Sequence, residues 1–323
     1  HWAAAQGCAL LGPNAGVQRP HAGLNLSQHP TLARSGRLAV VSQSRAVAAA
    51  LIDWAEDVHL GLSSMVALGD ETVTRLPQTL DYLATDPRTD SIVLYLEEIE
   101  FGREFISALR AAASVKPVIV LKVGRASDSA FADSAFDAAL RRAGAVRVRY
   151  FLQLFSALKV LSYARRPKGN RLAILSNGSG PPQMAFDMIE GGAPILKAEL
   201  SPETRRMLGK LLEPGAAPTN PVMTRQAMTP SLMHSLLECL VDDPAVDGVL
   251  VLLTPDARAE LNGVTTELAQ FAPRARKPVI TCFMGDAGMR PLRRRLDDAG
   301  AASFRTPESA AYGFGALASY HYN

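Results

Sequence analysis

The feature that most constrains how this 323-residue chain can fold is a single plan that occurs twice. Short apolar runs alternate with amphipathic stretches, and the run "RLAVVSQS" at residues 37–44 is matched by "RLAILSNG" at 171–178. In the same way, "KPVIVLKVG" at 116–124 is matched by "KPVITCFMG" at 277–285. Runs that are apolar on both faces are typical of parallel strands covered by helices. The sequence therefore predicts an α/β fold with two doubly wound domains, each built on a parallel sheet.

The chain is long enough for two domains with separate hydrophobic cores. The matching runs are not evenly spaced, because the second half carries extra residues around 213–230, so the chain is not a regular repeat array. A basic segment with proline and glycine, "ARRPKGN" at 164–170, predicts the domain boundary. We expect a first domain over 31–166 and a second over 167–323, after an initial segment over 1–30.

Composition narrows the classes of partner. The formal charge of +3 is too small to argue for nucleic acid or a membrane surface, and no apolar run is long enough to cross a bilayer. The cysteines, Cys8, Cys239 and Cys282, are too far apart for a disulfide framework or a zinc site, and the six histidines are scattered, so no metal is expected. The chain begins "HWAAAQG", without methionine or a signal region. We expect a cytoplasmic protein, and a piece of a longer one.

Two loops between a predicted strand and a predicted helix are candidate anion sites. The N-terminus of a helix offers free N–H groups and the positive end of the helix dipole, which favours phosphate. A loop of this kind also occurs merely to make the turn, but two at matching positions favour a shared anion. The candidate binding residues are Ser42, Gln43, Ser44 and Arg45 in the first loop, and Ser176, Asn177, Gly178, Ser179 and Gly180 in the second.

A family resemblance supports this interpretation. The segments "LLGPN", "GLNLS", "GRLAVVSQSRAV", "LDYLATDPRTDSIVLYLEEI", "KPVIVLKVGR", "FDAALRRAG", "RLAILSNGSGP", "TNPV" and "FRTPESA" occur in this order. Together they resemble the succinyl-CoA-synthetase-like region of NDP-forming acyl-CoA synthetases, and especially the version inside bacterial protein lysine acetyltransferases. The resemblance covers nearly the whole chain and implies that both doubly wound domains are flavodoxin-like.

The resemblance also implies neighbours and cofactors. In that family a CoA-binding Rossmann domain comes first and ends with a segment like "LLGPN" at 10–14, so residues 1–30 would be its C-terminal remnant, with Asn14 near the ligand. An ATP-grasp domain follows the two flavodoxin-like domains, and the acetyltransferases add a GNAT-type domain. CoA or acetyl-CoA is therefore the expected cofactor, and ATP or ADP is expected only through the missing ATP-grasp domain. A homo-oligomer is also consistent with the resemblance.

One catalytic residue of the family is absent from this sequence. In the ligases a phosphohistidine, held by two helix N-termini that match the two loops above, carries phosphate between the acyl-CoA and nucleotide sites. Its loop would follow "VIVLKVGR", yet no histidine occurs between His59 and His234. Either the chain lost this loop, which we favour because the acetyltransferase versions also lack it, or a flexible loop is missing from the sequence.

Other positions leave alternatives open. Arg45 replaces a small residue of the family, and either binds a phosphate or carboxylate in a fork or is a solvated side chain. Asn220 belongs to a retained "TNPV" segment, where a structural turn competes with ligand binding. Lys122 and Arg125, after a predicted strand, are candidates for an anion. Glu97, Glu98 and Glu100 suit acid–base work or a solvated strand end, and "RRRLDD" at 293–298 is expected to be a solvated helix face.

Three functions remain from the sequence. The first is a CoA-ligase-like module of an acyl-CoA synthetase or protein lysine acetyltransferase, which binds acyl-CoA or another phosphate-bearing small molecule as a regulatory or scaffold region without turnover. The second is the α-like part of an active NDP-forming acetyl-CoA synthetase, an acid–thiol ligase. The third is a two-lobed small-molecule-binding protein of the periplasmic type, whose chain would cross between its lobes more than once.

Overall fold

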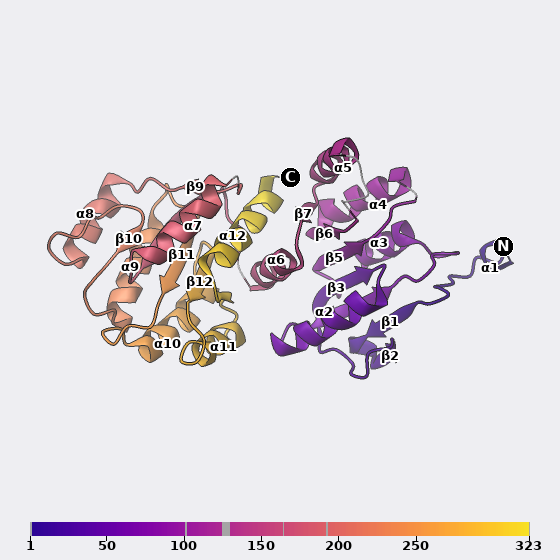
Figure 1. Ribbon diagram of the computed structural model, residues 1–323, viewed down its shortest axis with the longest axis horizontal. Helices are drawn as coiled ribbons and strands as arrows, with labels where there is room; N and C mark the ends of the chain where they lie inside the picture. The colour runs from indigo at the N-terminus through magenta and orange to yellow at the C-terminus, as the bar shows by residue number, and fades with distance from the viewer. Residues whose placement is uncertain (1, 101, 125–129, 164, 192, 323) are drawn as a thin grey trace. The chain divides into compact units, whose positions relative to one another are not determined.

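The computed structural model describes residues 2–100, 102–124, 130–163, 165–191 and 193–322. The chain forms two compact units, residues 1–154 and 155–322, which follow one another along the colour gradient of Figure 1. Each unit is described by itself. The chain passes between them once within the described residues, inside helix α6 (Phe151–Tyr163), and not repeatedly as a periplasmic-type binding protein would.

The first unit is built on one sheet of seven strands in the order β2-β1-β4-β3-β5-β6-β7. Strands β3 to β7 pair in parallel, whereas β1 pairs antiparallel with both β2 and β4. The parallel order, with the first strand of the series beside the second and third, is that of a flavodoxin-like fold. The strands are β1 (Gly16–Arg19), β2 (Leu24–Leu26), β3 (Ser35–Ser42), β4 (Leu62–Ala67), β5 (Ser91–Leu96), β6 (Val118–Lys122) and β7 (Val146–Val148).

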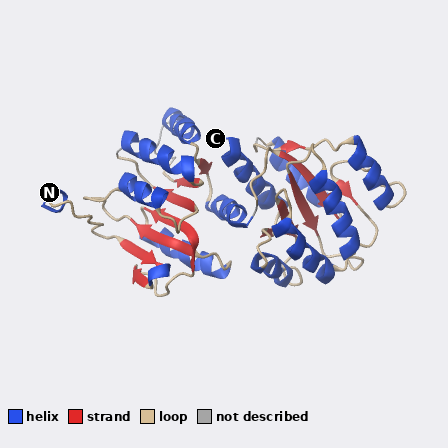
Figure 2. Cartoon of the chain, turned by 180° about the vertical axis from the view of Figure 1, so that it is seen from behind, coloured by secondary structure: helices blue, strands red, loops and turns tan. Residues whose placement is uncertain are grey.

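Helices cover both faces of this sheet, as Figure 2 shows. Alternate strand residues such as Val41 and Leu94 form a buried cluster with Phe105 and Leu109 of α4, and with residues of α3 and α5. Helix α2 contacts β3 and β4 but contributes nothing to that cluster, which places it on the opposite face. The helical segments are α1 (Trp2–Ala5), η1 (Pro20–Ala22), α2 (Arg45–Asp57), α3 (Leu76–Thr85), α4 (Gly102–Val115) and α5 (Ala130–Ala143).

The second unit repeats the plan with strands that all pair in parallel, in the order β10-β8-β11-β12-β13, and with β9 also pairing with β8. One apolar cluster joins the sheet to α8, α9, α10 and α11, and another joins it to α7 and α12. The strands are β8 (Arg171–Ser176), β9 (Leu196–Lys197), β10 (Val222–Met223), β11 (Gly248–Leu253), β12 (Val279–Phe283) and β13 (Ser303–Phe304). The helical segments are α7 (Gly180–Glu190), α8 (Pro202–Leu211), α9 (Pro230–Asp242), α10 (Leu261–Phe271), η2 (Ala272–Arg274), α11 (Arg290–Asp298) and α12 (Pro307–Tyr322).

The predicted α/β fold with two doubly wound, flavodoxin-like halves is confirmed. The sequence places residues 16–26 in an initial segment before the first doubly wound domain. In the structure they form β1 and β2, which extend the sheet of the first unit in the antiparallel sense. The division between the two units falls inside α6, and the predicted boundary segment at 164–170 stays a prediction. The interpretation of residues 1–30 as the end of a preceding CoA-binding domain stays a prediction.

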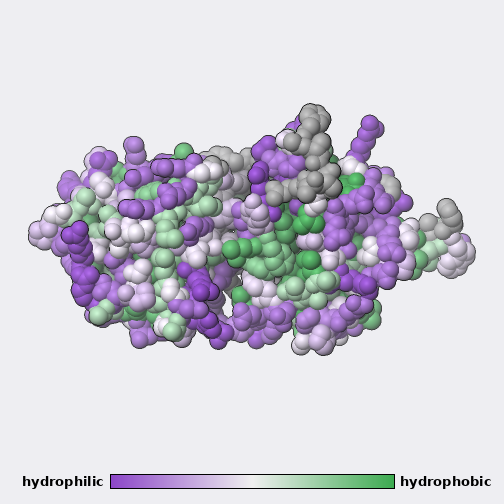
Figure 3. All heavy atoms as spheres, in the orientation of Figure 1, coloured by the Kyte–Doolittle hydropathy of each residue, from purple (hydrophilic) through white to green (hydrophobic). Residues whose placement is uncertain are grey.

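No helix in the described ranges is long and apolar enough to span a membrane. On the face that Figure 3 shows, hydrophilic side chains are spread over both units.

The segment 293–298 is only in part the solvated face that its charges predict, because Arg294, Arg295 and Asp298 are exposed whereas Arg293 and Asp297 are not. Arg293 is buried, and its guanidinium donates to the carbonyl oxygens of Phe283 and Gly285, both at 2.6 Å. Asp297 accepts a hydrogen bond from Lys159 Nζ at 2.8 Å, and burial raises the pKa of this carboxyl. Both charges lie inside because each has a partner there, which a run of charged letters does not reveal.

A histidine joins α9 to α10 on the outer surface of the second unit. His234 Nδ1 lies 2.7 Å from Glu267 Oε1, and Nε2 lies 3.2 Å from Glu238 Oε1. The ring also meets Phe271 edge-on, with 5.5 Å between centroids. The hydrogen bond to Glu267, opposed by partial burial and helped by the Glu238 charge, raises the pKa of His234 above its usual value.

This pair of contacts predicts a pH-dependent stability of the second unit. Because the pKa of His234 is raised on folding, its contribution is fully present below the unfolded-state value near 6.5 and is lost as the pH rises through the folded-state pKa. The unfolding free energy, measured by urea denaturation between about pH 5 and pH 9, should fall over that window in the parent chain. The fall should be smaller in His234→Gln; an unchanged pH profile in this variant would contradict the assignment.

Candidate functional site

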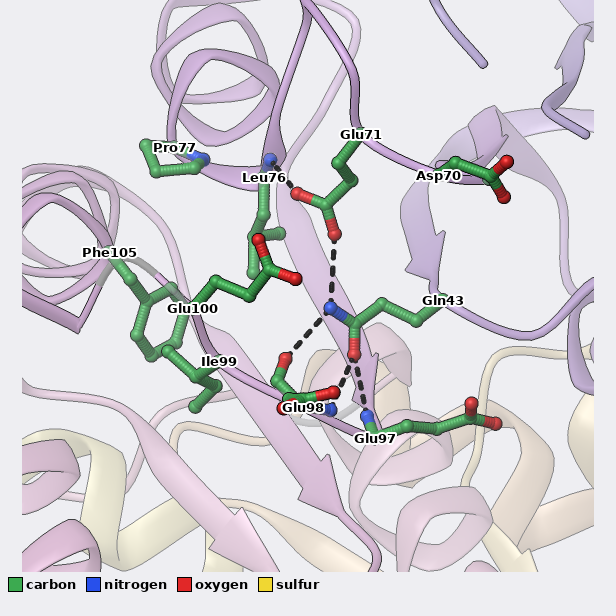
Figure 4. Close-up of a pocket in the computed structure, with 11 residues that line it drawn as sticks. Gln43, Asp70, Glu71, Leu76, Pro77, Glu97, Glu98, Ile99, Glu100 and Phe105 are labelled. Carbon is green, nitrogen blue, oxygen red and sulfur yellow. Dashed lines mark hydrogen bonds between the residues drawn. The ribbon is translucent and has the colours of Figure 1, made fainter. Parts of the chain in front are cut away.

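The carboxyl ends of the strands in the first unit surround a small cavity at the point where the strand order reverses, between β3 and β5. Parallel α/β sheets bind ligands at such a reversal, because the flanking helices leave toward opposite faces there. The cavity measures about 240 Å³, and we call it the Gln43 cavity. It is lined by Gln43, Gly69, Asp70, Glu71, Leu76, Pro77, Glu97, Glu98, Ile99, Glu100 and Phe105, most of which are drawn in Figure 4.

Hydrogen bonds of its own serine side chains fix the conformation of the first predicted loop. Ser42 Oγ donates to the carbonyl oxygen of Ser44 at 2.7 Å and accepts from the Ser44 N–H at 3.0 Å. Ser44 Oγ in turn accepts from the Val47 N–H at 3.4 Å and so caps helix α2. The two hydroxyl groups that the sequence offers as phosphate donors are therefore bonded to their own loop.

Gln43 fastens the end of β3 to the end of β5. Its Oε1 accepts from the N–H groups of Glu97 at 2.6 Å and Glu98 at 3.0 Å. Its Nε2 donates to the Glu98 carbonyl oxygen at 2.8 Å and to Glu71 Oε1 at 3.0 Å (Figure 4). We call these four bonds the Gln43 latch. The Gln43 amide therefore positions backbone groups and one carboxylate, and both its oxygen and its nitrogen are already hydrogen-bonded within the protein.

Carboxylates dominate the electrostatics of the Gln43 cavity. Glu71, Glu98 and Glu100 lie around the end of the Gln43 side chain (Figure 4), and Asp70 and Glu97 also line the cavity. At an effective dielectric constant of 20, a carboxylate about 6 Å from a phosphate opposes it by roughly 3 kcal/mol before salt screening. A helix N-terminus attracts the same anion by only about 0.3–1 kcal/mol. The acidic residues of the lining therefore oppose the attraction of the helix N-terminus for an anion.

Tyr95 shows the effect of this charge on a neighbour. It lies near the end of β5, where it is buried. Burial first, and then the charge of Glu97 and a hydrogen bond with it, raise the pKa of the Tyr95 hydroxyl. The phenol therefore keeps its proton beside the Glu97 carboxylate at neutral pH.

Arg45 lies outside the Gln43 cavity. It is the first residue of α2, it is exposed, and it lines a separate small hollow with Ser27 and His29. Its side chain makes no hydrogen bond or ion pair with the residues that the structure describes. This placement agrees with the solvated alternative, and anion binding by Arg45 stays a prediction.

The "LLGPN" segment docks on the loop that follows β4. Leu10 N–H donates to Thr74 Oγ1 at 3.1 Å, and Asp70 N–H donates to the Pro13 carbonyl oxygen at 3.1 Å. Gly69 has a positive φ of 66°, and a Cβ there would lie 2.1 Å from the Pro13 oxygen, so the contact requires glycine. Asn14 is exposed and thereby comes beside Asp70, with Nδ2 3.4 Å from Asp70 Oδ1.

Lys122 lies beyond the Gln43 cavity, at the end of β6, and donates to the Val123 carbonyl oxygen at 3.2 Å. It lines a wider hollow of about 680 Å³ between α4 and α5, which shares Glu97, Glu98, Ile99 and Phe105 with the Gln43 cavity. The other walls are mainly apolar, with Ile106 and Phe136 among them. Arg125 lies outside the described residues.

The second predicted loop repeats the geometry of the first. Ser176 Oγ donates to the Gly178 carbonyl oxygen at 2.8 Å and accepts from the Gly178 N–H at 3.2 Å. Asn177 Oδ1 accepts from the Thr254 N–H at 2.9 Å, and Nδ2 donates to the Thr254 carbonyl oxygen at 3.0 Å. This Asn177 latch joins β8 to β11, as Gln43 joins β3 to β5.

The rest of the second loop is open but poor in donors. Ser179 and Gly180 are exposed, and a Cβ at Gly178 or Gly180 would meet nothing closer than 3.9 Å. The next two residues of α7 are prolines, which have no N–H to offer an anion. The loop is therefore a weaker cradle than its glycines suggest, and the prediction that both loops face one anion stays a prediction.

The side chain of Asn220 forms its hydrogen bonds with the backbone at the edge of the sheet. It is buried, and its Oδ1 accepts from the Ile174 N–H at 2.9 Å. Its Nδ2 donates to the carbonyl oxygens of Leu172 at 2.8 Å and Ala198 at 3.0 Å. The side chain thus bridges the gap between β9 and β10 on the edge of β8, which favours the structural alternative over ligand binding.

Sequence reasoning missed the role of the acidic loops. Asp70 and Glu71 are not among the predicted site residues, and the sequence leaves Glu97, Glu98 and Glu100 open between acid–base work and a solvated strand end. A usable signal was present, because both groups follow directly on buried strands, β4 and β5, whose carboxyl ends share one edge. Among the described residues, no group of histidine, cysteine and carboxylate side chains could hold a metal ion.

Comparison with known proteins gives this fold a family context. Residues 35–161 match the succinyl-CoA ligase like flavodoxin domain. Residues 35–161 are thus similar to the succinyl-CoA-ligase-like flavodoxin domain, the domain type that the resemblance predicts. The predicted resemblance is confirmed at this level, while the particular resemblance to protein lysine acetyltransferases stays a prediction.

The similarity extends beyond that domain. The chain is 32% identical, over 97% of its length, to acetate–CoA ligase (ADP-forming) I of Archaeoglobus fulgidus, and covers 46% of that protein. It is 28% identical, over 94% of its length, to the alpha subunit of acetate–CoA ligase (ADP-forming) II of Pyrococcus furiosus, and covers 70% of it. It thus spans about half of the single-chain relative and more of the separate subunit.

A solved structure shows the same likeness in space. The apo form of the dinucleotide-forming acetyl-coenzyme A synthetase 1 of Candidatus Korarchaeum cryptofilum superposes with a TM-score of 0.89 at 28% identity. The match covers 98% of this chain and 72% of that chain. The same synthetase is also known in complex with phosphate and ADP.

The Gln43 latch predicts a measurable contribution to the stability of the first unit. In Gln43→Ala, three backbone groups of Glu97 and Glu98 lose their partner, and at about 1 kcal/mol per net hydrogen bond we expect a loss of about 2 kcal/mol, because water reaches part of the site. Urea denaturation measures the change. Ser114→Ala, which removes one bond on the exposed side of α4, should change stability by less than about 0.5 kcal/mol. Equal effects of the two variants would contradict the latch.

Asn220→Ala should destabilise the second unit by about 3 kcal/mol, because it leaves buried backbone groups of Leu172, Ile174 and Ala198 without partners. Asn220→Asp keeps the size but cannot donate to two carbonyls, so it should be almost as unfavourable. Asn262→Ala, at a surface contact with Arg295, serves as the mild control. Thermal and urea denaturation of the three variants check this, and a neutral Asn220→Ala would reopen a ligand role.

Proposed function

We propose that this chain is the α-type part of an NDP-forming acyl-CoA synthetase, an acid–thiol ligase that works together with a nucleotide-binding part. The observation that carries the proposal is the likeness along almost the whole chain to an alpha subunit of an ADP-forming acetate–CoA ligase, with a TM-score of 0.89 to an acetyl-coenzyme A synthetase. Such likeness covers both units and the "LLGPN" segment, and is not limited to the matched domain.

The chemistry proposed for the chain is the joining of a carboxylic acid to CoA at the cost of a nucleoside triphosphate. CoA or an acyl-CoA is the ligand proposed for this chain, and the nucleotide is proposed for the part that it lacks. Relatives are named for acetate and for 4-hydroxybutyrate, so the acyl group is left open. The Gln43 cavity is the proposed reaction edge, and Asn14 lies beside Asp70 of its lining.

A second candidate function has its own support. The sequence has no histidine between His59 and His234, and five acidic residues are among those that line the Gln43 cavity. These two features favour a module that binds acyl-CoA without turnover, as a regulatory or scaffold region of an acyl-CoA synthetase or a protein lysine acetyltransferase. Its partners would be the missing Rossmann, ATP-grasp and GNAT-type domains, or a second copy of the chain.

One experiment separates the two candidates. The full-length protein, or this chain with its nucleotide-binding part, is incubated with γ-labelled ATP, CoA and acetate, and both acyl-CoA formation and protein-bound label are measured. The proposed ligase forms acyl-CoA, and Glu97→Gln in the Gln43 cavity should lower the rate at least tenfold. Glu203→Gln, on an exposed carboxylate paired with Arg206, is the matched control and should leave the rate unchanged.

The absence of both acyl-CoA and label, together with saturable binding of acetyl-CoA in a calorimetric titration, would overturn the ligase proposal and favour the module. Acyl-CoA formation that survives in Glu97→Gln would place the reacting groups outside the Gln43 cavity.

A further inference from the structure

Three arginines converge on one aspartate at the edge of the second unit. Asp286 Oδ2 lies 2.7 Å from a terminal nitrogen of Arg290, and Oδ1 lies 2.9 Å from a terminal nitrogen of Arg293. A terminal nitrogen of Arg305 stands farther off, at 3.6 Å from Oδ2. The hydrogen bond from Arg290 lowers the pKa of Asp286, opposed by burial, and the charges of Arg290 and Arg305 and the hydrogen bond from Arg293 lower it further. We call these four residues the Asp286 cluster.

The charges of the Asp286 cluster do not cancel. Three guanidinium groups face one carboxylate, and guanidinium groups keep their charge at any relevant pH. Glu308, at the start of α12, is another acidic group near this edge, since it and Arg293 both act on the buried Cys282. Counting it, the local charge is still positive by one unit. Like charges held this close gain from an added anion.

Arg305 is the member of the cluster best placed to meet a ligand. Its side chain is 68% exposed, and its contact with Asp286 is longer than a hydrogen bond. Within the described part of the chain it makes no hydrogen bond, so its planar set of N–H donors remains available. A guanidinium with this geometry binds the oxygens of a phosphate in pairs.

The scaffold under Arg305 is rigid and lies at the ligand-binding edge of the sheet. Strands β12 and β13 pair in parallel, with Cys282 opposite Phe304, so Asp286 and Arg305 follow directly on neighbouring strand ends. Arg293, only 10% exposed, ties the turn after β12 through the carbonyl oxygens of Phe283 and Gly285. Ligands of parallel α/β sheets bind outside these carboxyl ends.

We propose that the Asp286 cluster binds a phosphate group, either free or carried by a nucleotide or CoA, with Arg305 as the contacting residue. The site lies wholly in the second unit. It goes beyond the proposed function and does not depend on it, since a negative result for acyl-CoA formation would leave phosphate binding at this edge unaffected.

The test is a titration of the isotopically labelled chain with inorganic phosphate at low ionic strength, followed by NMR signals of residues 285–290 and 304–306. We expect saturable shifts with a Kd on the order of 1 mM, about −4 kcal/mol. Arg305→Ala should weaken binding at least fivefold. Arg206→Ala is the matched control, because Arg206 is also 68% exposed but pairs one-to-one with Glu203.

A parallel titration with ADP separates the sources of the phosphate. Tighter binding of ADP on the same signals indicates a nucleotide, and equal binding indicates a lone phosphate group. The proposal is overturned if these signals do not move at phosphate concentrations on the order of 10 mM, or if Arg206→Ala weakens binding as much as Arg305→Ala. Circular dichroism of each variant establishes that the fold is retained.

Discussion

The structure depends on one recurring interaction, a side-chain amide that joins two strand ends where the strand order reverses. At this point the flanking helices leave in opposite directions, so backbone groups at the strand ends have no neighbouring element to bond. An amide supplies both a donor and an acceptor. Gln43 uses both toward Glu97 and Glu98, and Asn177 uses both toward Thr254. The shared device shows that the two halves follow one plan in detail as well as in topology.

The Gln43 latch also determines which charges lie at the carboxyl ends of the strands in the first unit. By holding the backbone of Glu97 and Glu98 and one oxygen of Glu71, Gln43 keeps acidic side chains around a small cavity. Their combined repulsion opposes the pull of a helix N-terminus on phosphate. The first unit therefore combines a flavodoxin-like scaffold with a strand edge that is rich in carboxylates. The arginines around Asp286 give the second unit a local positive charge instead.

The fold was predictable because its signal is redundant. The apolar runs 37–44 and 171–178 have similar residues, lie at a similar distance from the next predicted helix, and end in loops of similar composition. Each run therefore supports the same topology. The short strands β1 and β2 escaped because three or four residues with one polar face carry little periodicity.

The site was harder to predict, because the same residue types serve ligands and backbone. Ser42, Gln43, Ser176 and Asn177 have the composition of an anion loop, yet their polar atoms are bonded to their own chain. In the same way, the Asn220 amide forms hydrogen bonds with the backbone of β8 where the neighbouring edge strand is interrupted. Asn220 and its partner Ile174 are 46 residues apart in the sequence, and Gln43 and its partner Glu98 are 55 residues apart. Local sequence patterns contain no information on contacts over such separations.

Residue-by-residue amide hydrogen exchange tests the central claim most directly. If the amide latches hold the strand ends, the N–H groups of Glu97, Glu98 and Thr254 exchange slowly in the parent chain. Gln43→Ala should then speed exchange at Glu97 and Glu98 alone, and Asn177→Ala at Thr254 alone. Fast exchange at these positions in the parent chain, or no change in either variant, would contradict the account.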